Sequence, residues 1–280
     1  MWPATGLSMM KTIMAKMTDS AGGCVFRPSA KDLCAFLSDY AGWLFSCGAT
    51  CVRLEKNVGR IASAAGLRAD LSIFPRHLHI TVSDSCRSFL FTAVSSIHDC
   101  PVNFAMNTRL SKLSWDIADG NVDFVCARRE LEEITTAPAG DNGRLPLMVA
   151  CANGAFCRLF GGDAVAMAVV LVATFAGFII KQVMGERRVD QRVTVVVCSF
   201  VSSVLAAADG LFALGSTPSI AIGTSVLYLV PGIPFINSFC DVVDRHYICA
   251  FGRLMNALVI TACLSAGLCG GMVMMNVGMF

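Results

Sequence analysis

Charged residues are scarce in this sequence. Only 15% of its 280 residues are Asp, Glu, Lys or Arg, against roughly 25% in soluble domains. The scarcity is uneven, because residues 1–144 hold 15 of the 22 Lys and Arg and 14 of the 20 Asp and Glu, while residues 145–280 hold the remaining 7 and 6. The composition changes across the turn-prone stretch APAGDNGRLP at 137–146. We therefore expect a water-soluble part followed by a membrane part.

Sequence patterns typical of several classes of site are also missing. The chain has no P-loop, no GxGxxG, no GxSxG and no CxxC, and none of its four histidines pairs with cysteine at zinc spacing. The net charge of +2 gives no reason to expect nucleic acid as a partner. The fourteen cysteines are scattered, and the closest notable pair in the first half is Cys47 and Cys51, one helical turn apart. We expect reduced, mostly buried cysteines, no metal and no cofactor.

The first 28 residues give no sign of an ordered segment. Lys11 and Lys16 interrupt any apolar run, so this stretch does not have the pattern of a signal peptide. We expect a disordered tail over 1–28, a cytoplasmic domain over 29–140 and a transmembrane domain over 145–280.

The pattern of residues 29–140 predicts an α+β domain. Apolar residues at helical spacing run from Ser29 to Ala65, with a break near Gly48. Short β-rich runs follow, LSIF, LHITVS and SFLFTAV, and two further helices are expected near 106–117 and 122–134.

A pair of histidines raises the question of catalysis in this domain. His77 and His79 alternate on the second predicted strand, close to Ser83 and Asp84, which would suit a hydrolase. However, no nucleophile-elbow sequence accompanies them. We therefore interpret the domain as a gating, docking or regulatory module and not as an enzyme.

Residues 145–280 predict an all-α polytopic membrane domain of about five helices. A bilayer core is spanned by about 20 apolar residues, and the first predicted segment is marginal by this measure. The five segments are 145–160, 164–180, 193–214, 220–236 and 249–280. The basic loop KQVMGERRVDQR and Arg245 favour a cytoplasmic N-terminal domain under the positive-inside rule, and five crossings then put the C-terminus outside.

The fourth segment contains an unusual break. Pro231, Gly232 and Pro234 fall within an uncharged run from Gly210 to Cys240, and proline inside a helix costs about 3 kcal/mol or more. Broken membrane helices in transporters present free backbone groups to a solute. The alternative is that Pro231 ends the helix at the membrane surface.

Polar residues in the apolar segments are the other candidates for a solute path. They are Asp209 in the third segment, Asn237 in the fourth, and Arg253 with Asn256 on one face of the fifth. Each of the charged ones could instead lie near a membrane boundary and reach water.

Several stretches together resemble the threonine/serine exporter family, and in particular its YjjP-like members. They are SCGATCVRLEKNVGRIASAAGL (46–67), IFPRHLHITVSD (73–84), LFGGD (159–163), YLVPGIPFINSFCDVVDRHY (228–247) and GRLMNALVI (252–260). The first contains the family's Arg-x-Glu as Arg53 and Glu55, and the third ends in Asp163. Where the family often has glutamate in Arg-x-x-Glu, this chain has Asn256, which puts a proton-coupling role there in doubt.

The resemblance implies secondary export of small polar metabolites, threonine and serine or dicarboxylates such as succinate, across the cell inner membrane. It implies a path that includes Asp163 and the broken segment. Fused family members carry a second set of transmembrane helices that this chain does not have, so a small YjjB-like membrane subunit or a homo-oligomer is the expected partner in the bilayer. The alternative function is a membrane-anchored enzyme or sensor with a helical anchor that transports nothing.

Overall fold

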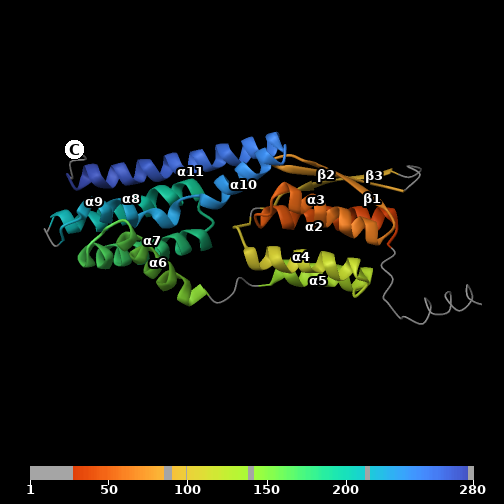
Figure 1. Ribbon diagram of the computed structural model, residues 1–280, viewed down its shortest axis with the longest axis horizontal. Coiled ribbons are helices and arrows are strands. Elements are labelled where there is room, and N and C mark those ends of the chain that lie inside the picture. Colours follow the sequence, from red (N-terminus) through yellow and green to blue (C-terminus); the bar gives the residue numbers. More distant parts are fainter. Residues whose placement is uncertain (1–27, 85–89, 99, 138–141, 212–214, 277–280) are drawn as a thin grey trace, which may run out of the picture. The chain divides into compact units, whose positions relative to one another are not determined.

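The chain forms two compact units, Met1–Ala137 and Pro138–Phe280. The computed structural model describes residues 28–84, 90–98, 100–137, 142–211 and 215–276 (Figure 1). The predicted disordered tail, 1–28, lies outside the described residues except for its last position.

The first unit contains four helices and three strands in its described part. The helices are α2 (Ala30–Ser46), α3 (Cys51–Ala64), α4 (Phe104–Ala118) and α5 (Phe124–Thr136). The strands are β1 (Arg68–Ile73), β2 (His77–Ser83) and β3 (Leu90–Ser96). This order confirms the α+β prediction for the region, including the two late helices.

Local sequence signals explain where the first two helices begin and end. Ser29 caps α2, because its hydroxyl accepts a hydrogen bond from the amide of Asp32 at 3.1 Å. Thr50 caps α3 in the same way. Between them, Gly48 has φ +97°, a left-handed conformation that L side chains rarely adopt, which is why the chain turns there.

The three strands form an antiparallel sheet in the order β1-β2-β3. Leu78, Ile80 and Val82 of β2 are fully buried, whereas His77 and His79 are exposed, so the predicted alternation is confirmed. Helix α2 packs against β2 and β3, and α3 packs against α4. The helices α3 and α4 therefore lie side by side, which matters for the pocket described below.

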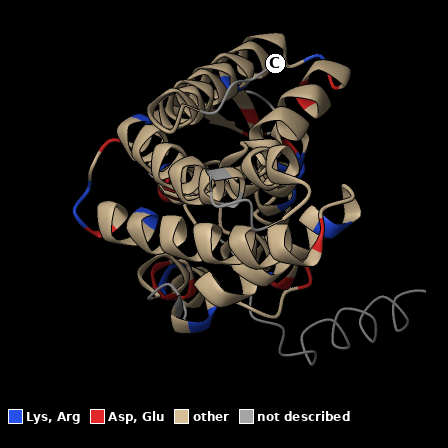
Figure 2. Ribbon diagram, turned by 90° about the vertical axis from the view of Figure 1, so that its left-hand side faces the viewer, with Lys and Arg blue, Asp and Glu red and all other residues tan. Residues whose placement is uncertain are grey.

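The second unit is helical throughout its described residues apart from short connections. Its helices are α6 (Leu145–Leu159), α7 (Ala164–Glu186), α8 (Gln191–Leu211), α9 (Pro218–Ser225), α10 (Gly232–Val243) and α11 (Tyr247–Met274), with 3-10 turns η1 (Asn142–Arg144) and η2 (Leu227–Leu229). Figure 2 shows long stretches of helix without a charged residue.

Three of these helices, α7, α8 and α11, are long and apolar enough to cross a membrane, and α9 with α10 makes a fourth if the bent pair is one span. Helix α6 has only 15 residues. Five crossings thus remain a prediction.

Two predicted boundaries were wrong. Helix α7 continues to Glu186 and does not end near Ile180, so much of the basic stretch assigned to a loop is helical. Likewise, the fourth predicted segment ends at 236, whereas α10 continues to Val243 and includes Asp241. In both cases helix-compatible polar residues extend an apolar helix beyond its apolar run.

Small residues let the helices of the second unit approach closely. A Cβ on Gly267 or Gly271 of α11 would run into Ser199 or Ser203 of α8. A Cβ on Gly177 of α7 would run into the hydroxyl groups of Tyr228 and Ser202. Small residues at helix contacts are typical of membrane bundles, in which no hydrophobic effect drives the helices together.

Candidate functional site: the broken helix and its polar surroundings

The apolar segment from Pro218 to Val243 is broken at Val230 and Pro231. Helices α9 and α10 meet there at 63°, with η2 between them. Pro231 precedes the first residue of α10, and Pro234 lies in its first turn, where a helix needs no backbone N–H. The prolines therefore begin a new helix after the break and do not kink a continuous one.

A helix that ends inside an apolar bundle leaves backbone carbonyl groups that water cannot reach. At the end of α9, side chains from α6 and α7 donate hydrogen bonds to these carbonyl groups. The amide Nδ2 of Asn153 in α6 donates to the carbonyl oxygen of Thr224 at 3.1 Å and to Oγ1 of Thr174 in α7 at 2.7 Å. The hydroxyl of Thr174 in turn donates to the carbonyl oxygen of Ser225 at 3.5 Å.

A second pair of polar groups continues this arrangement into α8. The hydroxyl groups of Ser202 and Tyr228 lie 3.0 Å apart, and Ser202 also donates to the carbonyl oxygen of Ala173 at 3.4 Å. We call Asn153, Thr174, Ser202, Thr224, Ser225 and Tyr228 the polar cluster. All of its members except Tyr228 are buried. The cluster links α6, α7 and α8 to the segment at the break.

An ion pair joins the helix after the break to α11. Nη1 of Arg253 lies 3.2 Å from Oδ2 of Asp241, and their side chains are 15% and 0% exposed. Close by, the hydroxyl of Ser238 donates to the carbonyl oxygen of Ala250 at 2.7 Å. Burial makes such a pair depend on both partners, since either charge alone would be left without compensation.

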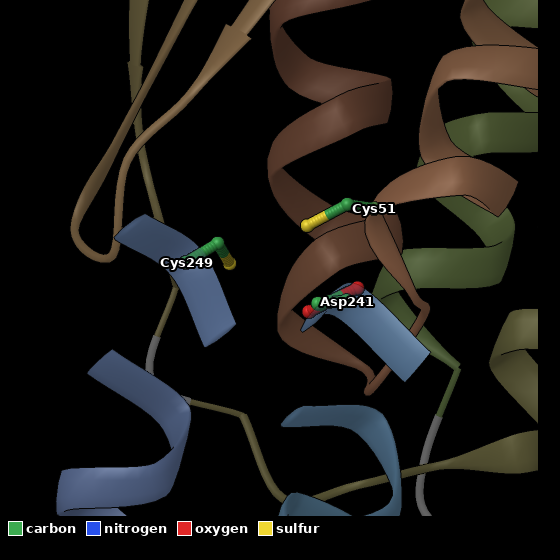
Figure 3. Close-up of side chains that lie close together, drawn as sticks. All are labelled: Cys51, Asp241 and Cys249. Atoms are coloured by element: carbon green, nitrogen blue, oxygen red, sulfur yellow. The ribbon is translucent and has the colours of Figure 1, made fainter. Parts of the chain in front are cut away.

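A carboxylate oxygen of Asp241 also lies within 4.8 Å of Sγ of Cys249, a residue in the first turn of α11 (Figure 3). Cys51, the third side chain labelled there, belongs to the first unit and is not a residue of this site. Structural zinc sites use four ligands. Two ligand atoms, one of them paired with Arg253, do not amount to such a centre.

Asp163 has a structural role at a helix start. Its carboxylate accepts hydrogen bonds from the amide of Ala166 at 2.7 Å, which caps α7, and from the amide and hydroxyl of Ser216 at 2.6 and 3.0 Å. These bonds, first the one from Ala166, lower the pKa of Asp163. Asp163 thus fastens the turn before α7 to the turn before α9.

Three of the other polar residues predicted in the second unit, Asn237, Arg253 and Asn256, lie on α10 and α11. Asn256 is exposed on α11, while Arg253 is paired with Asp241 of α10. Asn237 is half-buried in α10. Asp209 is in the last turn of α8, but its side chain lies outside the described residues.

The sequence analysis missed Asn153, Thr174, Tyr228 and Asp241. A signal existed for Asn153, because an amide in an apolar segment is as unusual as the charges that were singled out. No comparable indication existed in the sequence for Asp241, because a carboxylate beyond an apolar run is typical of a loop. Its role became visible only with its ion-pair partner Arg253 in α11.

In the first unit, Arg53 and Glu55 lie on α3. Nη1 of Arg53 donates to Oδ1 of Asn107 in α4 at 2.9 Å. The side chains of Arg53 and Glu55 are both exposed.

The chain is similar in sequence to two proteins that are named as transporter subunits. Over 134 residues the chain is 30% identical to the "Probable succinate transporter subunit YjjP" of Klebsiella aerogenes, covering 46% of this chain and 51% of that protein. Over 125 residues it is 28% identical to the protein of the same name in Escherichia coli K12, covering 43% and 48%. The chain thus spans about half the length of the curated relatives it matches. No solved structure matches it.

The family match covers much more of the chain. The model of the ThrE family, described as "Putative threonine/serine exporter", matches residues 35–275, which include most of both units and the whole of the broken segment. The chain therefore belongs to the threonine/serine exporter family.

Proposed function

We propose that this chain is a subunit of a secondary exporter that moves small polar metabolites out of the cytoplasm, with the broken helix pair α9–α10 lining the path. The observation that carries the proposal is the break at Val230 and Pro231, with side chains of α6 and α7 bonded to the carbonyl groups at the end of α9. A plain anchor has no use for such a break, because an uninterrupted helix satisfies its own backbone at no cost.

The polar cluster supports a path for a polar solute. Its groups are neutral amides and hydroxyls, which can donate to or accept from a solute and can exchange one hydrogen bond for another. Transporters with broken helices hold their substrates beside such unwound backbone. Pro231 lies at the break, Gly232, Pro234 and Asn237 follow it on α10, and all four belong to the same proposed path.

The substrate is proposed from the family and its named members. The family description refers to threonine and serine, and the two relatives are named succinate transporter subunits. All of these are small and polar. The word "subunit" in both names supports a multi-chain exporter, and we propose a small YjjB-like membrane protein, further copies of this chain, or both as its partners.

The proposed location is the inner membrane, with the N-terminal domain in the cytoplasm. Arg187 and Arg188 lie in the connection between α7 and α8, Arg192 follows in the first turn of α8, and Arg245 lies between α10 and α11. Both connections fall on one side if α8 crosses once and α9–α10 crosses once, so the positive-inside rule supports a cytoplasmic position for both. Counting α6 as a crossing gives five and puts the C-terminus outside.

The test is efflux from cells. Cells that lack related exporters are loaded with labelled threonine, serine or succinate, and efflux is compared with and without this chain, alone and together with the small subunit. We expect faster efflux of at least one of the three when the full set of subunits is present. Unchanged efflux of all three would contradict the proposal.

A pair of asparagine variants connects the flux to the polar cluster. Asn153→Leu removes the donor to Thr224 and Thr174 at nearly constant volume, so efflux should fall at least tenfold, the equivalent of about 1.4 kcal/mol. Asn256→Leu, at an exposed position of α11, is the matched control and should keep most of the flux. If instead Asn256→Leu abolishes efflux and Asn153→Leu does not, the path runs along α11 and not beside the cluster.

A further inference from the structure

The first unit contains a pocket between α3 and α4 that the transport proposal does not use. Its volume is about 460 Å³, within the usual range of small-molecule sites. A single inorganic ion would fill only a small part of it. The walls consist mainly of polar side chains of the two helices, together with Trp115.

Three cationic side chains line this pocket, namely Arg53, Lys56 and Arg60. Their spacing of three and four residues places them on one face of α3. No acidic residue is among the described residues that line the pocket. Nor does any described carboxylate form an ion pair with one of the three. Within the described part of the first unit, the positive charge at this face therefore has no acidic partner.

Neutral groups hold the two guanidinium groups in place. Nη1 of Arg60 donates to Oδ1 of Asn57 at 2.9 Å and to Oγ of Ser114 at 2.6 Å, and the guanidinium lies 3.7 Å from the ring centre of Trp115. Nη1 of Arg53 donates to Oδ1 of Asn107. In both arginines the bonds to the protein use one terminal nitrogen, so other N–H donors remain for a ligand.

The buried hydrogen bonds behind the pocket make this arrangement rigid. Asn57, which positions Arg60, is itself buried and donates to the hydroxyl of Tyr40 at 3.1 Å and to the hydroxyl of Ser111 at 3.2 Å. The hydroxyl of Tyr40 donates to the carbonyl oxygen of Leu110. A cation fixed in advance loses little entropy when an anion binds, which strengthens recognition.

We propose that this pocket binds a small organic anion with two or more negative charges, carried by phosphate or carboxylate groups. Arginine forks match both groups in geometry, and Lys56 adds a point charge between them. Arg53 and Arg60 are about 10 Å apart along the helix axis at 1.5 Å per residue, which suits a ligand with charges at separate positions. The hydroxyl groups of Thr108 and Ser111 line the same pocket from α4 and can bind the ligand's oxygen atoms. This site is distinct from the broken helix and gives the first unit a ligand of its own.

Calorimetric titration of the purified full chain in detergent tests the proposal. Pyrophosphate probes the phosphate class, succinate the carboxylate class, and uncharged succinamide serves as the matched neutral compound. We expect saturable binding of at least one anion and none of succinamide. Binding of one anion alone identifies the class. Absence of saturable binding for both anions at millimolar concentration, or equal binding of succinamide, would overturn the proposal.

Lysine variants locate the binding. Lys56 is exposed, so Lys56→Gln should leave the fold intact and weaken binding about tenfold, as expected for one lost charged contact. Lys31→Gln on α2 makes the same charge change away from the pocket and should bind like the parent chain. Equal weakening in both variants would mean that net charge, and not this pocket, attracts the anion, and would also overturn the proposal.

Discussion

The two units bury different kinds of side chain. The largest fully buried residues all belong to the first unit, among them Phe36, Tyr40 and Leu110. In the second unit most of the fully buried described positions are held by small residues, such as Ala173, Ser203 and Ala207. Large apolar side chains of the second unit, including Phe239, are instead exposed.

This is the difference expected between a unit that folds in water and one that folds in lipid. In water, burying a large apolar side chain stabilises a fold by about 1.5–3 kcal/mol. In lipid that gain disappears, because the acyl chains are as apolar as leucine, and helices associate through close packing and hydrogen bonds between them. The second unit has the arrangement expected in lipid, with hydroxyl groups and glycines at its helix contacts and apolar side chains on its surface.

Tryptophan gives a way to observe the units separately. All three tryptophans, Trp2, Trp43 and Trp115, belong to residues 1–137. Their fluorescence therefore reports unfolding of the first unit alone, whereas circular dichroism reports the helices of both.

The largest effect is expected from Arg253→Met, which leaves the buried carboxylate of Asp241 without its cation. Breaking a buried ion pair in this way costs about 3–5 kcal/mol. The dichroism transition of the purified protein should move to clearly lower temperature, while the tryptophan transition stays in place.

The double variant Asp241→Leu with Arg253→Met removes both charges and is the control. It should regain most of the lost stability, because an apolar pair replaces an ion pair at little cost. A single variant as stable as the parent chain would show that the pair does not hold α10 to α11.

An intermediate effect is expected from Gly267→Ala. The added methyl group would run into Ser199 and the carbonyl oxygen of Val196 on α8, and overpacking of this kind costs about 1–3 kcal/mol. Gly270→Ala is the matched control on the same helix, since its nearest neighbour, Phe200, would be at an ordinary 3.5 Å. Only the first should lower the dichroism transition, and equal behaviour of the two would contradict close packing of α8 on α11.

Much of the first unit could be predicted from the sequence, because its signals are local. The alternation Leu78, Ile80, Val82 depends only on the period of a strand, and the break at Gly48 only on a backbone conformation that glycine tolerates. The apolar runs and the break at Pro231 in the second unit were equally visible.

The candidate site was less predictable, because its members meet only in three dimensions. Asn153 and Thr224 are 71 residues apart in the chain, and Thr174 lies between them on another helix. Arg253 forms an ion pair with Asp241, a residue that the sequence analysis did not single out. Spacing along one helix predicts shared faces, whereas contacts between helices depend on packing that no single segment encodes.

The smallest effect on stability is expected from replacing two aspartates that each cap the start of a helix, one in each unit. Asp123 caps α5 by accepting a hydrogen bond from the amide of Cys126, and Asp163 caps α7 while also binding Ser216. These bonds from backbone amides lower the pKa of both carboxyl groups. Each aspartate therefore adds stability above the pKa of an unfolded aspartate, near 3.9, and this contribution is lost as the pH falls through the lower folded value.

Asparagine at either position should make the corresponding transition less dependent on pH below about 4. Because Asp163 joins two turns and Asp123 only one, Asp163→Asn should lower the dichroism transition at pH 7 by more than Asp123→Asn lowers the tryptophan transition. Melting curves of both variants between pH 3 and pH 7 measure this. If the order were reversed, the turn before α9 would not depend on Asp163, and the start of the broken segment would have to be held by its own residues, Thr217 and Pro218, which begin α9 without a side-chain cap.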